Sequence, residues 1–473
     1  MPRTSLGIVL LAASGWAQPF EIAINHGRVI DPESGLDGVR HVGIAGGKIR
    51  SVSTTPLKAA TVIDAKGLIV SPGFIDLHWH GRDPASYRYC VLQGVTSALE
   101  MEIGVADIAG WYREREGRSP IHFGAAAGHP PIRMAVMKDP GGFLPTGDAA
   151  TRAATEEEVA EIARRLEAQL KLGAPAVGLG LAYTHGASYR EILDVFRVAA
   201  RFRASCHVHM RHTSSFAGDA EMGLSEVIAA AAITRAPLQV VHLNASAGKS
   251  IDSALKILTE ARENGLDVTT EAYPYTAGST GIQSGVFKDW QSQPDSWFGT
   301  LQWVKTGERL TRASFERYRK VGGSVIVHSN TPERLDKAIL SPLTMISSDG
   351  SDLPGGQGHP RSAGCYARIL AHYVRDRQAL SLEEAIRKMA LLPARRLEGR
   401  VPAMKNKGRI REGADADIAV FDLARVEDHS TYERPALEPE GFVDVLVNGE
   451  FVLRDGKVVS GVVQGRPIRA AVE

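Results

Sequence analysis

Short stretches of alternating apolar and polar residues occupy both ends of the chain. Near the N-terminus, FEIAINHGRVID and VRHVGIAGGKIRSVS alternate in this way, with glycine and aspartate at the turns. Near the C-terminus, FVDVLVNGEFVLRDGKVVS has the same character, and Asn448-Gly449 and Asp455-Gly456 favour tight hairpin turns. We therefore expect a small β-sandwich domain assembled from residues 18–70 and 405–473.

The long middle of the chain alternates strand-like apolar runs with amphipathic helical patterns. Thr155 and Glu158 form a capping box before a helix whose apolar residues recur at helical spacing. Between such helices lie the short runs APAVGLGLAY, SCHVHM, LQVVHLN, LDVTTEAY, GSVIVHS and LTMISSD. Strands and helices in alternation imply a parallel sheet, and this many units predict a closed (β/α)8 barrel over residues 71–404.

The first residues have the pattern of a targeting segment. Arg3 supplies a short basic region, LGIVLLAA is a compact apolar run, and Gly15-Trp16-Ala17 is a small-x-small cleavage site. The apolar run is about half of the roughly 20 residues needed to span a bilayer. We expect a cleaved signal peptide over residues 1–17, an exported protein that is periplasmic or secreted, and no membrane span.

Charge and cysteine content exclude two other classes of protein. Lys and Arg total 55 against 54 acidic residues, and no block of like charge is present, so a nucleic-acid partner is not expected. The three cysteines, Cys90, Cys206 and Cys365, are too few and too scattered for a disulfide scaffold or a thiolate zinc cluster. The sequence is that of an ordinary globular α/β protein.

Histidines and acidic residues stand at the ends of several predicted barrel strands. Asp76, His78 and His80 close the first strand, Glu100 and Glu102 the second, His207 and His209 the fifth, His242 the sixth and Asp349 the eighth. Residues two apart in a strand face the same side, so His78 and His80 both point into the barrel mouth. Barrel enzymes place their sites at these strand ends, and imidazoles with carboxylates are the ligands of zinc or a similar divalent ion. We predict a metal site here.

A set of motifs then extends over nearly all of the chain beyond residue 17. They are VSPGFIDLHWH, a late SSDG, KGRIREGADADIAVFDL with a terminal VNG hairpin, VGLGLAYTHGASY, HVHMRH, QVVHLNASAGKS, EAYPYTAGST and GHPRSAGCYARIL. In combination they resemble the amidohydrolase superfamily and, within it, the D-aminoacylase (N-acyl-D-amino-acid deacylase) group. The resemblance implies a (β/α)8 barrel with a small β domain, one or two Zn2+ ions, and hydrolysis of the amide bond of N-acyl-D-amino acids.

The resemblance also implies roles for individual metal-site residues. His78 and His80 match ligands of a more exposed ion, His209 and His242 match ligands of a more buried ion, and Asp349 matches an acid that binds metal or water and shuttles protons. Superfamily members often bridge two ions with a carboxylated lysine on the fourth strand, but AVGLGLAY has none, and LEMEIG lacks the second-strand cysteine of D-aminoacylases.

A glutamate on the second strand is the natural substitute for that bridge, because a carboxylate has two oxygens to share. We favour Glu102, which lies nearer the end of the strand, over Glu100, which shares its face.

The substrate is expected to be a small molecule with a free carboxylate. Arg361 matches the family arginine that holds this group, and a guanidinium fork suits a planar anion. Tyr275 matches a tyrosine at the same carboxylate, and Tyr183 and Asn244 complete the predicted substrate-binding set. Asn244 stands where D-aminoacylases commonly carry a lysine, so one positive charge is missing from the pocket.

Three alternatives remain open. The substrate could be a dipeptide with a D residue, or a cyclic amide as in hydantoinases and dihydroorotases, although the missing fourth-strand lysine and Arg361 argue against a cyclic amide. A non-catalytic binding protein on a barrel scaffold would have lost ligands, and here all are present. Assembly into a homo-oligomer is compatible with the sequence.

Overall fold

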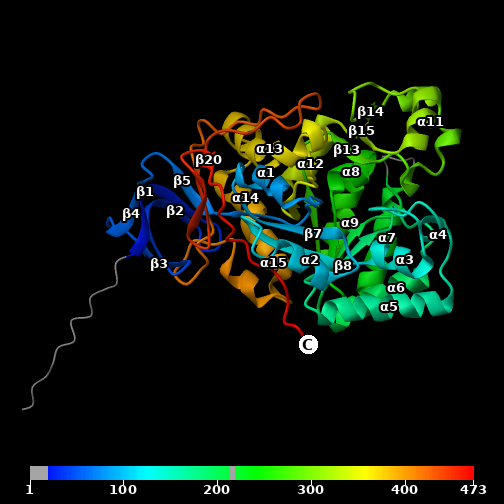
Figure 1. Cartoon of the computed structure of the whole chain (residues 1–473), viewed down its shortest axis with the longest axis horizontal. Helices are drawn as coiled ribbons and strands as arrows, with labels where there is room; N and C mark the ends of the chain where they lie inside the picture. Colours follow the sequence, from blue (N-terminus) through cyan, green and yellow to red (C-terminus); the bar gives the residue numbers. More distant parts are fainter. Residues whose placement is uncertain (1–19, 214–218) are drawn as a thin grey trace, which may run out of the picture.

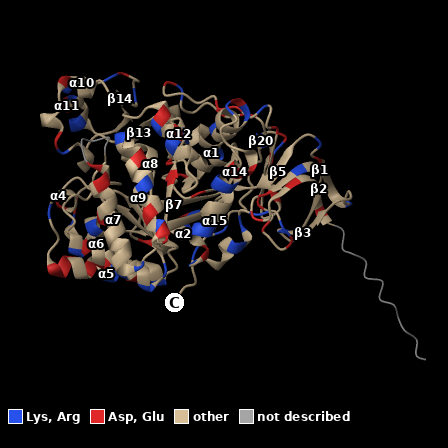
Figure 2. Cartoon of the chain, turned by 180° about the vertical axis from the view of Figure 1, so that it is seen from behind, with Lys and Arg blue, Asp and Glu red and all other residues tan. Residues whose placement is uncertain are grey.

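The computed structural model describes residues 20–213 and 219–473, so the predicted signal segment lies outside the described residues. Strands from both ends of the chain form one sheet beside a barrel built from the middle (Figure 1). No helix among the described residues is long and apolar enough to span a membrane. Acidic and basic residues are interspersed over the outer helices (Figure 2).

The β domain is a nine-stranded sheet in the order β20-β19-β18-β17-β5-β1-β2-β3, with β4 also paired to β1. Its strands are β1 (Phe20–Asp31), β2 (Leu36–Ala45), β3 (Lys48–Ser53), β4 (Ala59–Asp64), β5 (Ile69–Pro72), β17 (Ile418–Phe421), β18 (Phe442–Val447), β19 (Glu450–Arg454) and β20 (Lys457–Val458). Antiparallel pairing of β5 with β17 joins the two ends of the chain, so the expected β domain built from both termini is confirmed.

This sheet branches at β1. The register of β1 shifts between Ile24 and Gly27. The part before the shift pairs with β4, and the part after it pairs with β5. Apolar residues of β1, β2, β5 and β17 fill the core of the domain, among them Ile24, Val42, Val70 and Ile418.

Eight parallel strands form the barrel in chain order. They are β6 (Phe74–Asp76), β7 (Val95–Val105), β8 (His122–Gly128), β9 (Ala176–Gly180), β10 (Ser205–His209), β11 (Leu238–Val240), β12 (Val268–Ala272) and β16 (Thr344–Ile346). The first and last strands meet just beyond their C-terminal ends, where the His80 N–H donates to the Gly350 carbonyl at 2.7 Å. The (β/α)8 fold is therefore confirmed, and the barrel closes at its mouth.

Helices cover the outside of the barrel and follow the strands. They are α1 (Tyr87–Val91), α2 (Ile108–Arg115), α3 (His129–Met137), α4 (Asp148–Thr151), α5 (Glu156–Lys171), α6 (Tyr189–Arg201), α7 (Ala220–Thr234), α8 (Leu243–Ala247), α9 (Ile251–Glu263), α12 (Pro332–Leu340), α13 (Arg361–Arg368), α14 (Leu382–Ile386) and α15 (Leu392–Glu398). The predicted capping box of Thr155 and Glu158 opens α5, and the helix buries Val159, Ile162 and Leu166.

An insertion between β12 and β16 forms a separate three-stranded antiparallel sheet with its own aromatic core. It contains β13 (Ala277–Gly281), β14 (Leu301–Trp303), β15 (Ser324–His328), α10 (Asp295–Phe298) and α11 (Arg312–Val321). The run GSVIVHS, which the alternation placed among the barrel strands, is β15 of this insertion. That expectation was wrong because a short apolar run does not reveal which sheet its backbone will join.

Two segments beyond residue 404 contact the barrel instead of the β sheet. Ser430 donates its hydroxyl to the Pro360 carbonyl at 3.1 Å. At the N-terminal ends of the strands, the Ile468 N–H donates to Phe123 at 2.7 Å and the Ala470 N–H to Gly173 at 2.9 Å. The division of the chain at residues 70 and 404 stays a prediction.

Candidate metal centre

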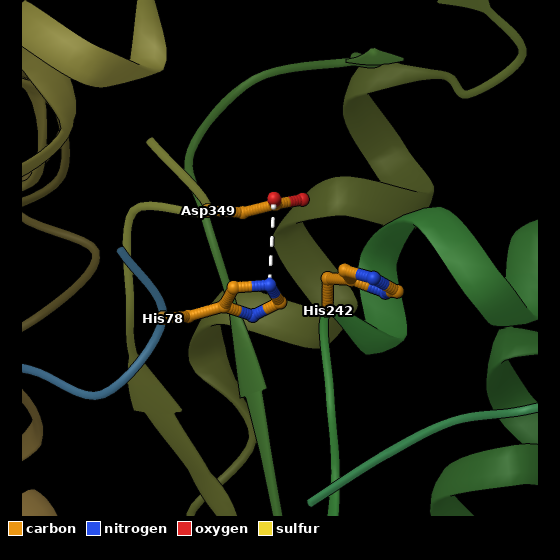
Figure 3. A group of neighbouring side chains, drawn as sticks. All are labelled: His78, His242 and Asp349. Atoms are coloured by element: carbon orange, nitrogen blue, oxygen red, sulfur yellow. Dashed lines mark ion pairs between the residues drawn. The ribbon is translucent and has the colours of Figure 1, made fainter. Parts of the chain in front are cut away.

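The structure brings the six predicted metal residues together at the C-terminal ends of five barrel strands. His78 and His80 follow β6, Glu102 lies on β7, His209 ends β10, His242 follows β11 and Asp349 follows β16. All six are nearly or fully buried, and their ligand-type atoms form overlapping groups in which every atom lies within 4.8 Å of the others. Figure 3 shows the imidazoles of His78 and His242 near the carboxylate of Asp349, with the ion pair between His78 and Asp349 dashed.

Glu102 lies between two pairs of imidazoles. Its Oε2 atom is 3.3 Å from His78 Nε2 and 3.2 Å from His80 Nε2. Its Oε1 atom is 2.6 Å from His209 Nδ1 and 3.0 Å from His242 Nε2. Each carboxylate oxygen therefore serves a different pair, which is the arrangement needed to bridge two ions.

Glu100 occupies a different place. Its Oε2 atom lies 2.6 Å from His80 Nδ1, behind the imidazole, while its Oε1 accepts the backbone N–H of Ile103 at 3.1 Å. Glu100 therefore orients His80 and shapes the irregular end of β7. This geometry favours Glu102 over Glu100 as the bridging residue.

The position of Glu102 depends on a close approach of β9 to β7. A Cβ atom on Gly178 would lie 2.5 Å from the carbonyl oxygen of Glu102, closer than real Cβ atoms come to backbone. Glycine therefore allows the fourth strand to pass directly behind the Glu102 backbone. Strand β9, which lacks the lysine expected from the family resemblance, thus packs behind Glu102 and supports it.

Three residues contact the Nδ1 atoms of metal-site histidines and so fix the orientation of the rings. Glu271 Oε1 lies 2.5 Å from His78 Nδ1, and Ser246 Oγ lies 3.0 Å from His242 Nδ1. With Glu100, they occupy the Nδ1 atoms and turn the Nε2 atoms of His78, His80 and His242 towards the centre. The sequence pattern did not single out Glu271. The feature that could have identified it is an acidic residue at the end of the seventh barrel strand.

His207 lies two residues before His209 on β10 and so faces the same side of the strand, one step further from the mouth. Its Nε2 atom lies 3.0 Å from Ser205 Oγ.

Asp349 and His242 adopt a left-handed backbone conformation, with φ of 53° and 32° respectively. Such φ values are uncommon for residues other than glycine and cost of order 1–3 kcal/mol. Two hydrogen bonds stabilise this conformation at His242. The His242 carbonyl accepts the N–H groups of Ala245 at 2.9 Å and Ser246 at 3.1 Å. Both strained residues lie at the centre.

Opposing charges control protonation at the centre. Burial opposes ionisation of Asp349, but Arg361, with Nη1 2.8 Å from Asp349 Oδ2, and the nearby His78 outweigh it and hold the pKa of this carboxyl well below its ordinary value. Burial likewise opposes the ionised form of Glu102, yet His78 and His209 hold its pKa well below the ordinary range. Both carboxylates are therefore ionised at neutral pH.

A cavity of about 460 Å³ opens over the centre, and two predicted substrate residues line it. Arg361 is buried, its guanidinium lies 4.7 Å from the centre of the Tyr273 ring, and its Nε atom has no hydrogen-bond partner among the described residues. Tyr183 packs edge-on against His209, with ring centres 4.9 Å apart. The insertion contributes Thr280, Val304 and other residues to the same wall.

The other two predicted substrate residues do not line this cavity. The Tyr275 hydroxyl donates to Asp428 at 2.8 Å, and the Asn244 amide donates to the Tyr273 carbonyl at 3.2 Å. Tyr273 faces the cavity instead, and its hydroxyl has no hydrogen-bond partner among the described residues. A tight turn, in which the Tyr275 N–H donates to the Tyr273 carbonyl at 2.9 Å, breaks the strand alternation that would place both rings on one face.

The fold and the site together define a barrel enzyme of the metal-dependent hydrolase class. Over residues 61–453 the chain matches the amidohydrolase family, and it belongs to that family. Within the family it falls in the D-aminoacylase group. It is 31% identical over 482 residues to N-acyl-D-glutamate deacylase of Alcaligenes xylosoxydans xylosoxydans, covering 91% of this chain and 93% of the relative.

Two solved structures show the same architecture. N-acyl-D-glutamate deacylase from Bordetella bronchiseptica, complexed with zinc and a phosphonate inhibitor, superposes with a TM-score of 0.81 at 25% identity and covers 96% of this chain and 100% of its own. A D-aminoacylase described with a binuclear metal centre has a TM-score of 0.78, also at 25% identity, with 96% and 100% covered.

Proposed function

We propose that this protein is a metal-dependent hydrolase that removes the acyl group from N-acyl-D-amino acids. The observation that carries the proposal is the position of Glu102 between two imidazole pairs, beside Asp349 and Arg361 and beneath one cavity. The relatives support the substrate class and the D configuration, because their names describe deacylases of D-amino acids.

The donor atoms at the centre fit a divalent cation. With their Nδ1 atoms bound to Glu271 and Glu100, neutral His78 and His80 would present lone pairs from two Nε2 atoms only 3.1 Å apart. Glu102 Oε2 lies 3.2–3.3 Å from both of these atoms, and Asp349 Oδ1 lies 3.4 Å from both. Atoms packed so closely need either protons or a cation between them. Without an ion, burial opposes the charged forms of His78 and His80, but the neighbouring carboxylates raise the pKa of both well above the ordinary value.

His78, His80 and Asp349 would hold one ion, His209 and His242 would hold a second, and Glu102 would be shared. Zn2+ suits imidazole and carboxylate ligands. A bound ion of this kind supplies Lewis acidity and makes hydroxide available near neutral pH.

Asp349 is placed to move the proton during amide hydrolysis. The Arg361 guanidinium keeps the Asp349 carboxylate ionised, so Asp349 can accept a proton from the attacking water as the new C–O bond forms. The same carboxyl then gives this proton to the leaving nitrogen as the C–N bond breaks. The products are a carboxylic acid and a free amino acid.

Arg361 and Tyr273 are placed to hold the substrate's α-carboxylate. The unpartnered Arg361 Nε and the unpartnered Tyr273 hydroxyl both belong to residues that line the cavity, beside Asp349. A buried donor without a partner is costly, and a bound carboxylate would satisfy both. Tyr273 therefore takes the role that the sequence assigned to Tyr275.

The test is amine release from matched N-acetyl-D- and N-acetyl-L-amino acids, with metal content measured on the same preparation. We expect turnover of D substrates, with activity and metal lost together on chelation and restored by Zn2+. D-residue dipeptides and hydantoins in the same assay test the alternative substrates. Turnover of hydantoins alone, or activity that survives complete metal removal, would overturn the proposal.

Export is proposed from the N-terminal pattern of Arg3, the apolar run and Ala17. The protein recovered from the exported fraction should begin at Gln18, as read by N-terminal sequencing, and its homo-oligomeric state can be measured by light scattering. A chain that starts at Met1 in the cytoplasmic fraction would contradict export.

A further inference from the structure

The cavity contains a second guanidinium that the proposed chemistry does not use. Arg82 lies two residues after His80 and lines the same cavity as Arg361. Arg361 is paired with Asp349, whereas the Arg82 side chain forms no ion pair within the part of the chain that the structure describes. A cation without an acidic partner at the mouth of a substrate cavity is available to bind an anion.

The backbone of Arg82 is fixed from two sides. Its N–H donates to Asp352 Oδ2 at 3.1 Å, and the N–H of Asp83 donates to Oδ1 of the same carboxylate at 3.4 Å. Its carbonyl accepts a hydrogen bond from buried Arg115 at 3.0 Å. The Asp352 carboxylate therefore accepts hydrogen bonds from backbone N–H groups, and the N–H donors of the Arg82 side chain remain available to a ligand.

Phe143 supports the Arg82 guanidinium. The guanidinium carbon lies 4.5 Å from the centre of the Phe143 ring, and that ring lies edge-on to His80, with ring centres 5.4 Å apart. Stacking of this kind orients a guanidinium and leaves its in-plane N–H groups free. The series His80, Phe143 and Arg82 thus places a positive charge at a defined position beside the metal centre.

The loop that carries Phe143 is itself held in place. The Asp139 carboxylate accepts the N–H groups of Gly141, Gly147 and Ala149, each at 2.9 Å, and that of Thr146 at 3.1 Å. Four hydrogen bonds to one carboxylate fix the backbone on both sides of Phe143. The platform beneath Arg82 is therefore ordered before any substrate binds.

We propose that Arg82 binds a second carboxylate of the substrate, so that the enzyme prefers N-acyl-amino acids with two anionic groups. The inference rests on the deacylase function proposed above, in which Arg361 takes the α-carboxylate. The second carboxylate belongs to the amino-acid side chain or to the acyl group, since both chemistries present the same planar anion. Arg82 is then a specificity-determining residue.

Two pairs of substrates test the inference, because the members of each pair differ mainly in one charge. N-acetyl-D-glutamate against N-acetyl-D-glutamine places the charge on the side chain, and N-succinyl-D-leucine against N-butyryl-D-leucine places it on the acyl group. We expect the wild type to favour the charged member of one pair by about 10- to 100-fold in kcat/KM, as for a hydrogen bond to a charged group. The preferred pair identifies the source of the carboxylate.

Arg82→Gln should bring that ratio close to one, mainly by raising KM for the charged substrate. Arg82→Lys keeps the positive charge but not the planar guanidinium, so it should retain part of the preference. It also keeps the inference testable if the glutamine variant does not fold. Arg113→Gln, an exposed arginine on α2 outside the cavity, is the matched control and should keep the wild-type ratio.

A wild type that shows no preference in either pair, or a full preference in Arg82→Gln, would overturn the inference. If neutral N-acyl-D-amino acids are still hydrolysed in a metal-dependent reaction, the proposed function survives that result. If no member of either pair is hydrolysed, the deacylase function fails, and the inference fails with it.

Discussion

Two of the buried clusters of charged residues in this molecule differ in how their charges are balanced. The first joins the barrel to the β domain. Asp417, next to β17, lies 2.6 Å from Lys407 Nζ and 3.1 Å from Nε2 of His122 on β8, and it also accepts the backbone N–H of Asn448 at 2.8 Å. Lys407 in turn lies 2.9 Å from Asp415. Each charge in this cluster has an opposite partner within the protein.

The metal centre is not balanced in this way. Four carboxylates contact its imidazoles, namely Glu100, Glu102, Glu271 and Asp349, and within the described residues the one permanent cation paired with them is Arg361. With the imidazoles neutral, as they are when they bind a metal ion, negative charge is in excess. Buried charges that are paired within the protein need no ligand, whereas an unbalanced cluster under an open cavity is suited to bind a cation from outside.

The sharpest test of this comparison changes the charge of Glu102 without changing its shape. Glu102→Gln should reduce both metal content and turnover to background, because the two imidazole pairs lose the anion between them. Glu100→Gln should lose only about 10- to 100-fold in metal affinity or activity, as expected for a residue that orients a ligand. Metal analysis and amine release measure both effects. A near wild-type Glu102→Gln beside an inactive Glu100→Gln would show that the bridge is Glu100.

Asp349→Asn separates chemistry from folding at the same centre. We expect kcat to fall by about 10²–10⁴, the range for loss of a general acid or base. The buried Arg361 also loses its anionic partner, so the melting temperature should fall, and kcat is therefore measured on folded protein of known metal content. Asp289→Asn, on the exposed surface, is the control. A kcat within threefold of the wild type would remove Asp349 from the proton transfer.

Lys407→Met tests the balanced cluster. It leaves Asp417 and Asp415 buried without their cation, which should cost about 3–5 kcal/mol in the free energy of unfolding. The metal content of the folded protein should stay unchanged. Denaturant unfolding measures the effect, and Lys405→Met, an exposed neighbour, should stay within about 0.5 kcal/mol of the wild type. Loss of metal in folded Lys407→Met would contradict the separation of the two clusters.

The smallest expected effect is a pH dependence that comes from His122. Burial and nearby Lys407 lower the pKa of His122 below its ordinary value despite Asp417, so the folded state binds fewer protons than the unfolded state. Stability should therefore fall as the pH drops from about 7 to 5, by at most about 1.4 kcal/mol per pH unit from this residue. The difference between wild type and His122→Gln isolates this contribution, and a difference that is constant across this pH range would disprove it.

Local patterns in the sequence were sufficient for the barrel and for most of the centre. The period of two in the strands placed His78 and His80 together, and placed His207 on the same face of its strand as His209. The capping box at Thr155 located the start of α5. Such features depend on residues a few positions apart, and their geometry is set by the backbone itself.

Contacts between distant residues could be decided only by the tertiary structure. A turn after β12 brings Tyr273 rather than Tyr275 to the cavity, and Glu271 reaches His78 across the barrel. The run that became β15 pairs with the insertion because of hydrogen bonds to β13 and β14. Periodicity determines which residues of a segment share a face, whereas the partner that covers this face is selected by packing of the whole chain.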